Sequence, residues 1–187
     1  MKESENLIRV LEESIIAFKN KDSIKLKKLS NETVHTSSLN QDPNNILVAV
    51  IVYSLGKILE RENYLNLPGW KNFESLTTSA LKISVKDLKQ KKEEKFTQDL
   101  VQVRKAIGKI SGKLKKYVEE VFRRSEITKA SRIYEHGISL GRTSKLLGIT
   151  IYDLANYSGQ TGISEVSLNQ TISEKGRIKM LEDIFRW

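Results

Sequence analysis

The sequence predicts an all-α protein with a core of its own, and three observations lead to this expectation. Only two prolines and ten glycines interrupt 187 residues, and such a scarcity of helix breakers favours long helices over a many-turned β architecture. Apolar residues recur at spacings of three and four along most of the chain, which is the period of one helix face. Hydrophobic residues make up 39% of the chain, which is enough for a core.

Residues 1–90 are predicted to form an N-terminal helical bundle. The first helix, at residues 4–20, carries one apolar stripe made of Leu7, Leu11, Ile15 and Phe18. Asp22 is a good N-cap for a second helix, because its carboxylate can accept a hydrogen bond from a free backbone N–H of the first turn. That second helix carries Ile24, Leu26 and Leu29.

The rest of this bundle is predicted from two more start signals. Asp42 and Pro43 give a third helix a capping carboxylate and a proline at its first position. Its run at 46–53 is apolar on every side, which predicts the central core helix. After a turn at 67–69, a further helix is expected with a stripe of Trp70, Phe73, Leu76, Ala80 and Ile83.

Residues 91–124 are predicted to form one long basic heptad helix. Its apolar positions alternate spacings of four and three, and they are Phe96, Leu100, Val103, Ile107, Ile110, Leu114, Tyr117 and Val121. Such a seam is typical of a coiled coil or of a helix packed along a bundle. The seam therefore leaves two interpretations open, packing within the chain and a homodimer through this helix.

The same region holds most of the excess charge. Between Lys86 and Arg124 there are 13 basic and six acidic residues, which is +7 of the chain's net +9. One interpretation is a solvated helix face. The other is a stripe that follows nucleic-acid phosphates, with Arg104, Lys105 and Lys109 as candidate contacts.

Residues 125–160 are predicted to form a helix-turn-helix. Short helical stretches at 125–136, 140–147 and 150–158 surround a turn at Gly148, where glycine supplies the left-handed conformation. On duplex DNA, the outward residues Tyr152 and Asn156 would contact bases. The predicted phosphate contacts are Lys129, Arg132, Arg142 and Lys145.

The stretch 133–150, IYEHGISLGRTSKLLGIT, resembles the short helix-turn-helix antitoxins of prokaryotes. In that family an apolar helix, a glycine- and serine-containing segment and a second helix recur, often beside a gene for a PIN-domain nuclease. Ser144 stands where alanine is usual in the family. The resemblance implies DNA binding and a protein partner such as a toxin nuclease. Residues 161–187 are predicted to be a linker and an amphipathic helix, which packs back on the chain or docks on that partner.

No catalytic, metal or cofactor site is predicted. The chain has no cysteine and only two histidines, which are far apart, so the usual zinc spacings are absent. The stretch 29–35, LSNETVH, resembles a degraded form of the R-N-x-x-x-H motif of HEPN ribonucleases, with Ser30 in place of the arginine and His35 as the histidine. This resemblance implies at most a noncatalytic, HEPN-like RNA-binding bundle.

The sequence therefore predicts a noncatalytic DNA-binding or regulatory protein of antitoxin-like type. The alternative from another class is a scaffold or adaptor whose helix-turn-helix docks a protein, and the HEPN-like RNA-binding protein is the weaker one. No stretch of about 18 apolar residues is present, so no membrane span is expected. The composition and the lack of cysteine predict a cytoplasmic location.

Overall fold

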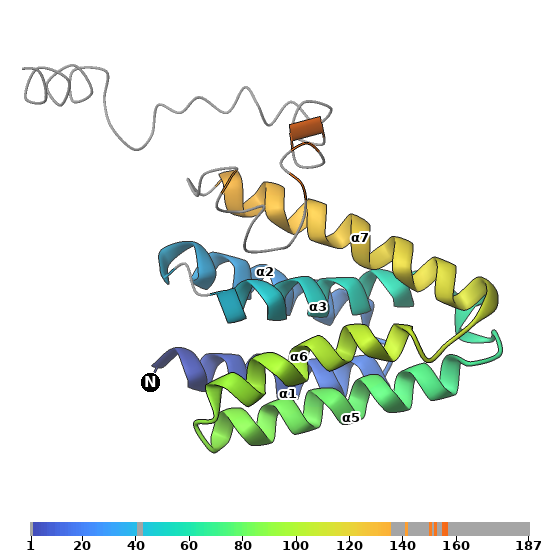
Figure 1. Cartoon of the computed structure of the whole chain (residues 1–187), viewed down its shortest axis with the longest axis horizontal. Coiled ribbons are helices and arrows are strands. Elements are labelled where there is room, and N and C mark those ends of the chain that lie inside the picture. The colour runs from blue at the N-terminus through green and yellow to red at the C-terminus, as the bar shows by residue number, and fades with distance from the viewer. Residues whose placement is uncertain are drawn as a thin grey trace, which may run out of the picture.

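The computed structural model describes residues 2–40 and 43–135, together with positions 141, 150, 152, 155 and 156. The regular elements in these residues are all helices, so the predicted all-α class is confirmed (Figure 1). They are α1 (Lys2–Lys19), α2 (Ser23–Asn40), α3 (Pro43–Leu59), α4 (Glu62–Leu65), α5 (Trp70–Lys89), α6 (Glu93–Ile107) and α7 (Gly112–Glu135). In this part of the chain, no helix combines the length and the apolar composition needed to cross a bilayer.

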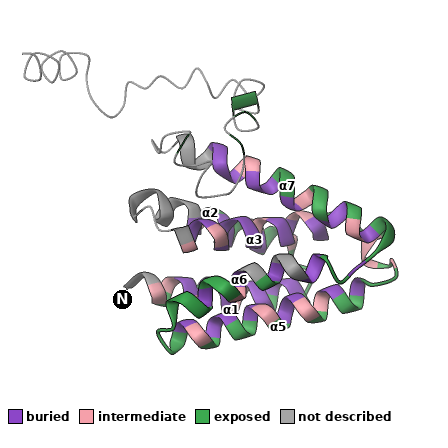
Figure 2. Cartoon of the chain, viewed as in Figure 1, coloured by how far each residue is buried: buried purple, intermediate pink, exposed green. Residues whose placement is uncertain are grey.

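Helix α3 lies at the centre of the bundle and contacts α1, α2, α6 and α7. Figure 1 shows α7 on one side of the α2–α3 pair and α1, α5 and α6 on the other. The apolar run of α3 is buried on several sides (Figure 2), with Val48, Ile51 and Leu55 fully inside. A helix covered by others in this way requires apolar residues all round. The prediction of a core helix that begins at Pro43 is confirmed.

The first two helices follow the prediction as well. The stripe of α1 is buried. The Asp22 carboxylate accepts a hydrogen bond from the backbone N–H of Lys25 at 2.8 Å, which is the bond expected of an N-cap. Ile24 departs from the prediction, because it is 75% exposed at the start of α2.

Helices α2 and α3 approach each other closely at Gly56. A Cβ atom at this position would lie 3.2 Å from the Cβ of Leu26 and 3.2 Å from the carbonyl oxygen of Ser23. These contacts are tighter than most Cβ contacts, so a side chain here would force its neighbours to move by a few tenths of an ångström. Packing rather than backbone conformation therefore favours glycine at this position.

Helix α5 departs from the predicted stripe near its end, although Ala80 of the stripe still packs against the core. Trp70 and Phe73 are buried as expected, but Ile83 is 50% exposed, while Leu81 and Val85 lie inside. The buried face also includes small polar residues, namely Thr77, Thr78 and Ser84. A count of apolar residues alone therefore placed the face wrongly in the second half of this helix.

The continuous heptad helix predicted for residues 91–124 is wrong. Helix α6 ends at Ile107, and α7 begins at Gly112. Between them, backbone N–H groups of Lys109 and Ile110 donate turn hydrogen bonds of 3.1 and 3.3 Å to Ala106 and Ile107. Gly112 has φ of +65°, a conformation that glycine adopts without steric cost. The chain reverses at this point, so α7 runs back over the other side of α3 (Figure 1).

The seam itself stays buried across the break. Its residues from Phe96 to Tyr117 all belong to the core cluster of the bundle, and Val121 packs against it. Because the chain's own helices already cover these side chains, they cannot also join two copies. Of the two interpretations of the seam, the structure therefore shows packing within the chain.

The boundary predicted at residue 125 is also wrong. Helix α7 continues without interruption to Glu135 and contacts α2 and α3. Ser125, Ala130 and Ser131 are buried against the bundle. The predicted first helix of the helix-turn-helix is therefore the last part of α7. The remainder of that unit lies outside the described residues, except for positions 141, 150, 152, 155 and 156, and so does the predicted tail at 161–187.

Candidate functional site

Lys129, predicted to contact phosphates, lies inside the protein and is only 2% exposed. Its Nζ donates a hydrogen bond of 2.8 Å to Oδ1 of Asn31. The same atom lies 4.2 Å from the centroid of the Tyr53 ring, within the range of a cation–π contact. Residues of α2 and α3 therefore hold the ammonium in place. The prediction of a phosphate contact is wrong, because a charge buried this deeply cannot reach a nucleic acid.

The two predicted base-contacting residues are on the surface. Tyr152 is 74% exposed, and Asn156 is exposed as well. Lys109 is exposed in the turn between α6 and α7. The side chains of Arg104, Lys105 and Arg132, and the whole of Arg142 and Lys145, lie outside the described residues.

The cations whose side chains the structure describes do not lie along one helix, because the predicted long helix is divided. One group lies around the α5–α6 turn and consists of Lys86, Lys89, Lys91, Lys92 and Lys95. The other lies around the α6–α7 turn and consists of Lys109, Lys113, Lys115 and Lys116. The 15 residues of α6 separate the two groups by roughly 22 Å at 1.5 Å per residue. The predicted phosphate-following stripe along a single helix is therefore wrong.

Lys109 lies at the opposite end of α7 from the residue where the chain enters the helix-turn-helix segment. It precedes α7, whereas that segment follows α7, and the 24 residues of this helix span roughly 36 Å.

The position compared with the HEPN arginine is buried. Ser30 lies in the contact between α2 and α3 and donates a hydrogen bond of 2.7 Å to the carbonyl oxygen of Ala49. A side chain at position 30 thus faces the inside of the bundle. The side chain of His35 lies outside the described residues.

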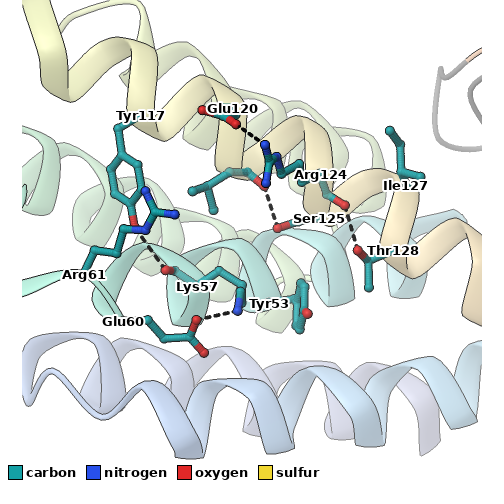
Figure 3. Close-up of a pocket in the computed structure, with 11 residues that line it drawn as sticks. Tyr53, Lys57, Glu60, Arg61, Tyr117, Glu120, Arg124, Ser125, Ile127 and Thr128 are labelled. Atoms are coloured by element: carbon teal, nitrogen blue, oxygen red, sulfur yellow. Dashed lines mark hydrogen bonds and ion pairs between the residues drawn. The ribbon is translucent and has the colours of Figure 1, made fainter. Parts of the chain in front are cut away.

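A pocket that the sequence did not predict lies between α3 and α7 (Figure 3). Its volume is about 450 Å³, which is within the range of small-molecule sites. On the α3 side it is lined by Tyr53, Lys57, Glu60 and Arg61. On the α7 side the lining includes Tyr117, Glu120, Val121, Arg124, Ser125, Ile127 and Thr128. Figure 3 shows Arg61 and Tyr117 at one end of the pocket and Ile127 and Thr128 at the other.

Tyr117 builds the wall at the first end. Its hydroxyl group donates to the carbonyl oxygens of Lys57 and Ile58, at 3.2 and 3.1 Å. These carbonyls belong to the last turn of α3, where no partner within the helix is available. Burial raises the pKa of Tyr117 to about 12, so the hydroxyl group remains a hydrogen-bond donor at neutral pH. The ring stacks on Tyr64, with centroids 3.7 Å apart.

The charges around the pocket leave one cation in excess. Lys57 pairs with Glu60, and Arg124 pairs with Glu120 at 2.5 Å. Burial is the largest influence on Glu60 and opposes ionisation, but hydrogen bonds from Lys27 and Lys57 outweigh it and lower the pKa of Glu60. This group is therefore a carboxylate at neutral pH.

Arg61 is the exception among these charged groups. It forms no ion pair with the described residues; its guanidinium carbon lies 5.5 Å from the centroid of the Tyr117 ring. Such a group keeps its hydrogen-bond donors available, and a guanidinium holds a carboxylate or phosphate through two parallel bonds. The pocket thus combines an available cation with aromatic and hydroxyl groups.

The structure offers no metal site in the residues that it describes, because no three His, Asp or Glu side chains converge there. The comparisons with known proteins add no family to these observations. No protein-family model, no curated protein and no solved structure matches the chain.

Proposed function

We propose that the protein is a noncatalytic, DNA-binding regulator of antitoxin-like type. The observation that carries the proposal is the exposure of Tyr152 and Asn156, the two residues expected to contact bases. An asparagine side chain can form a two-bond contact with adenine in the major groove. The net charge of +9 supports the proposal further, since the phosphate backbone supplies most of the affinity for DNA.

Because Lys129 is buried, fewer cations of the proposed regulator are available to contact the phosphate backbone of DNA. The cations left to contact phosphates beside Tyr152 are Arg132, Arg142 and Lys145. In this proposal the helical bundle is a rigid support, and the end of α7 carries the DNA-binding segment. Binding then involves fewer phosphate contacts than the sequence indicates, so its salt dependence is correspondingly shallow.

Fluorescence anisotropy with a labelled mixed-sequence DNA duplex tests this proposal across a salt series. We expect binding that weakens from about 50 to 200 mM salt. The double variant R142A/K145A should reduce the slope of log K against log salt by about 2. The matched control is K113A/K116A, which removes the same charge at the far end of α7 and should leave the slope unchanged. Absence of binding at low salt would end the DNA proposal, and equal slopes for the two double variants would end the role of Arg142 and Lys145.

Docking of a protein is the second candidate, and the exposure of Tyr152 supports it as well. A large aromatic side chain that is 74% exposed is typical of the anchor residues of protein interfaces. The two candidates differ in how they respond to Y152A and N156A. Loss of DNA affinity in both variants supports the regulator. If DNA binding is absent and Y152A alone prevents co-purification of a partner from the native cell, the scaffold or adaptor is favoured.

The HEPN-like proposal is the weakest, because position 30 faces the inside of the bundle. RNA cleavage that disappears in H35A would revive it.

A further inference from the structure

The pocket between α3 and α7 has two chemically different ends. Tyr117 and Thr128 are 11 residues apart on one helix, so the pocket extends along roughly 16 Å of α7. The first end holds Arg61, whose cation has no carboxylate partner in the described part of the chain. At the other end, Val121 and Ile127 contribute apolar surface beside Ser125 and Thr128.

The hydroxyl groups at the second end are oriented by their own helix. Ser125 donates to the carbonyl oxygen of Val121 at 2.7 Å, and Thr128 donates to that of Arg124 at 2.9 Å. Their oxygens therefore present lone pairs rather than protons to a ligand. A ligand with an N–H or O–H group at that end would be accepted better than one with an anionic group there.

Tyr53 lies between the two ends and is held by a contact on one side. The Lys129 ammonium lies 4.2 Å from its ring centroid, and the residue also lines the pocket. A cation beside the ring draws electron density from it, which favours stacking against an electron-rich planar group. Tyr53 thus offers an aromatic surface to a ligand in the pocket.

We propose that this pocket binds a small organic anion in which one carboxylate or phosphate is attached to a planar ring. The anionic group pairs with Arg61, and the ring lies against Tyr53 with its polar edge toward Ser125 and Thr128. Two sources share this chemistry, a nucleoside monophosphate and an aromatic carboxylate. The lining has three basic and two acidic residues, so its net charge is +1, which one carboxylate neutralises and which also attracts a phosphate monoester of about −2. All lining residues lie within or before α7, so the proposal does not rest on the proposed DNA binding.

Isothermal titration calorimetry of the full chain with adenosine 5′-monophosphate and with indole-3-carboxylate tests the proposal. Adenosine supplies the ring without the anion, and inorganic phosphate supplies the anion without the ring. We expect at least one of the two ring-bearing anions to bind at least tenfold more tightly than adenosine or phosphate. The one that binds identifies the source. If neither ring-bearing anion binds more tightly than adenosine and inorganic phosphate, the proposal is overturned.

Matched variants distinguish binding in this pocket from the general electrostatic attraction of an anion to a basic protein. R61A should weaken the binding of the ring-bearing anion about tenfold, since it removes a charge-assisted bidentate pair. The control is R123A, because Arg123 neighbours Arg124 on α7 but lines a different hollow with Glu119 and Glu126. R123A should bind as the unmodified protein does. Equal weakening in R61A and R123A would overturn the assignment, provided that both variants keep the unmodified melting temperature.

Discussion

Replacing Lys129 gives the most informative test of the fold, because its position contradicts what the sequence indicates. K129A removes three methylene groups and an ammonium from a position that is 2% exposed. The loss of three buried methylenes costs about 2.4 kcal/mol at about 0.8 kcal/mol each. A remaining cavity would add to this cost, so we expect a total of about 3 kcal/mol.

The ammonium contributes terms of both signs. Its hydrogen bond to Asn31 stabilises the fold by about 1.5–3 kcal/mol. Its contact with the Tyr53 ring adds up to about 2 kcal/mol. Burying the charge costs several kcal/mol, which offsets them. K129M keeps most of the volume and removes the charge, so we expect it to lie within about 1 kcal/mol of the unmodified protein. Packing, not charge, should therefore determine the stability at this position.

Thermal and urea unfolding followed by circular dichroism at 222 nm measure this difference. For a chain of this length, a loss of about 3 kcal/mol should lower Tm by roughly 6–12 °C. The control K113A removes an exposed lysine of the same helix and should change the free energy of unfolding by less than about 0.5 kcal/mol. If K129A is as stable as K113A, the ammonium is not buried, and Lys129 returns to the set of possible phosphate contacts.

Three further substitutions test individual contacts. G56A should destabilise the protein by about 1–2 kcal/mol in urea unfolding, because the new Cβ would lie 3.2 Å from the Cβ of Leu26 and the cost of overpacking exceeds the gain in helix propensity. An increase in stability would contradict the close approach of α2 and α3 at this position. Y117F should cost about 1–2 kcal/mol, since two carbonyls at the end of α3 lose their donor. The unmodified Tyr117 has its pKa raised to about 12, so stability should fall between about pH 10, the ordinary tyrosine value, and pH 12, and Y117F should lack this fall. Burial, and then the neighbouring Asp87, raise the pKa of Asp99, so the folded state favours the protonated carboxyl group and becomes less stable as the pH rises. D99N should therefore raise Tm at pH 7 and have no effect below about pH 4. Equal effects of D99N at both pH values would contradict the raised pKa of Asp99.

The parts of the fold that the sequence predicted depend on local signals. The cap at Asp22 and the start at Pro43 act within one turn of helix, so no knowledge of the tertiary structure is needed to find them. The apolar run of α3 indicated its central position for the same reason, since every face of that helix is covered. Local periodicity thus located these helices and the core.

The break between α6 and α7 escaped prediction because the seam stays in phase across it. Ile107, Ile110 and Leu114 keep spacings of three and four, and both helices turn these residues toward the same core. A periodicity count gives the same result for one long helix and for two antiparallel ones. The local signal was Gly112 together with Gly108, since two glycines so close together weaken a helix.

The candidate pocket could not be predicted, because its residues come from distant parts of the chain. Tyr53 and Arg61 belong to α3 and the turn after it, whereas Tyr117 and Arg124 belong to α7. The buried ammonium of Lys129 likewise depends on Asn31, which lies 98 positions away. Periodicity describes which face of a helix is apolar, but it does not describe which helix will cover that face.

The packing of α7 against α2 and α3 accounts for three features that the sequence did not predict. It buries Lys129, forms the pocket and incorporates residues 125–135 into the bundle. The chain therefore enters the predicted DNA-binding segment from the end of a packed helix. A ligand that occupies the pocket only when α7 lies against α3 must stabilise that packing, by thermodynamic linkage. The same free energy also stabilises the position of the end of α7, where the chain enters the predicted DNA-binding segment. Binding of a ligand in the pocket and binding of DNA are therefore coupled to the extent that DNA binding requires α7 to stay packed against α3.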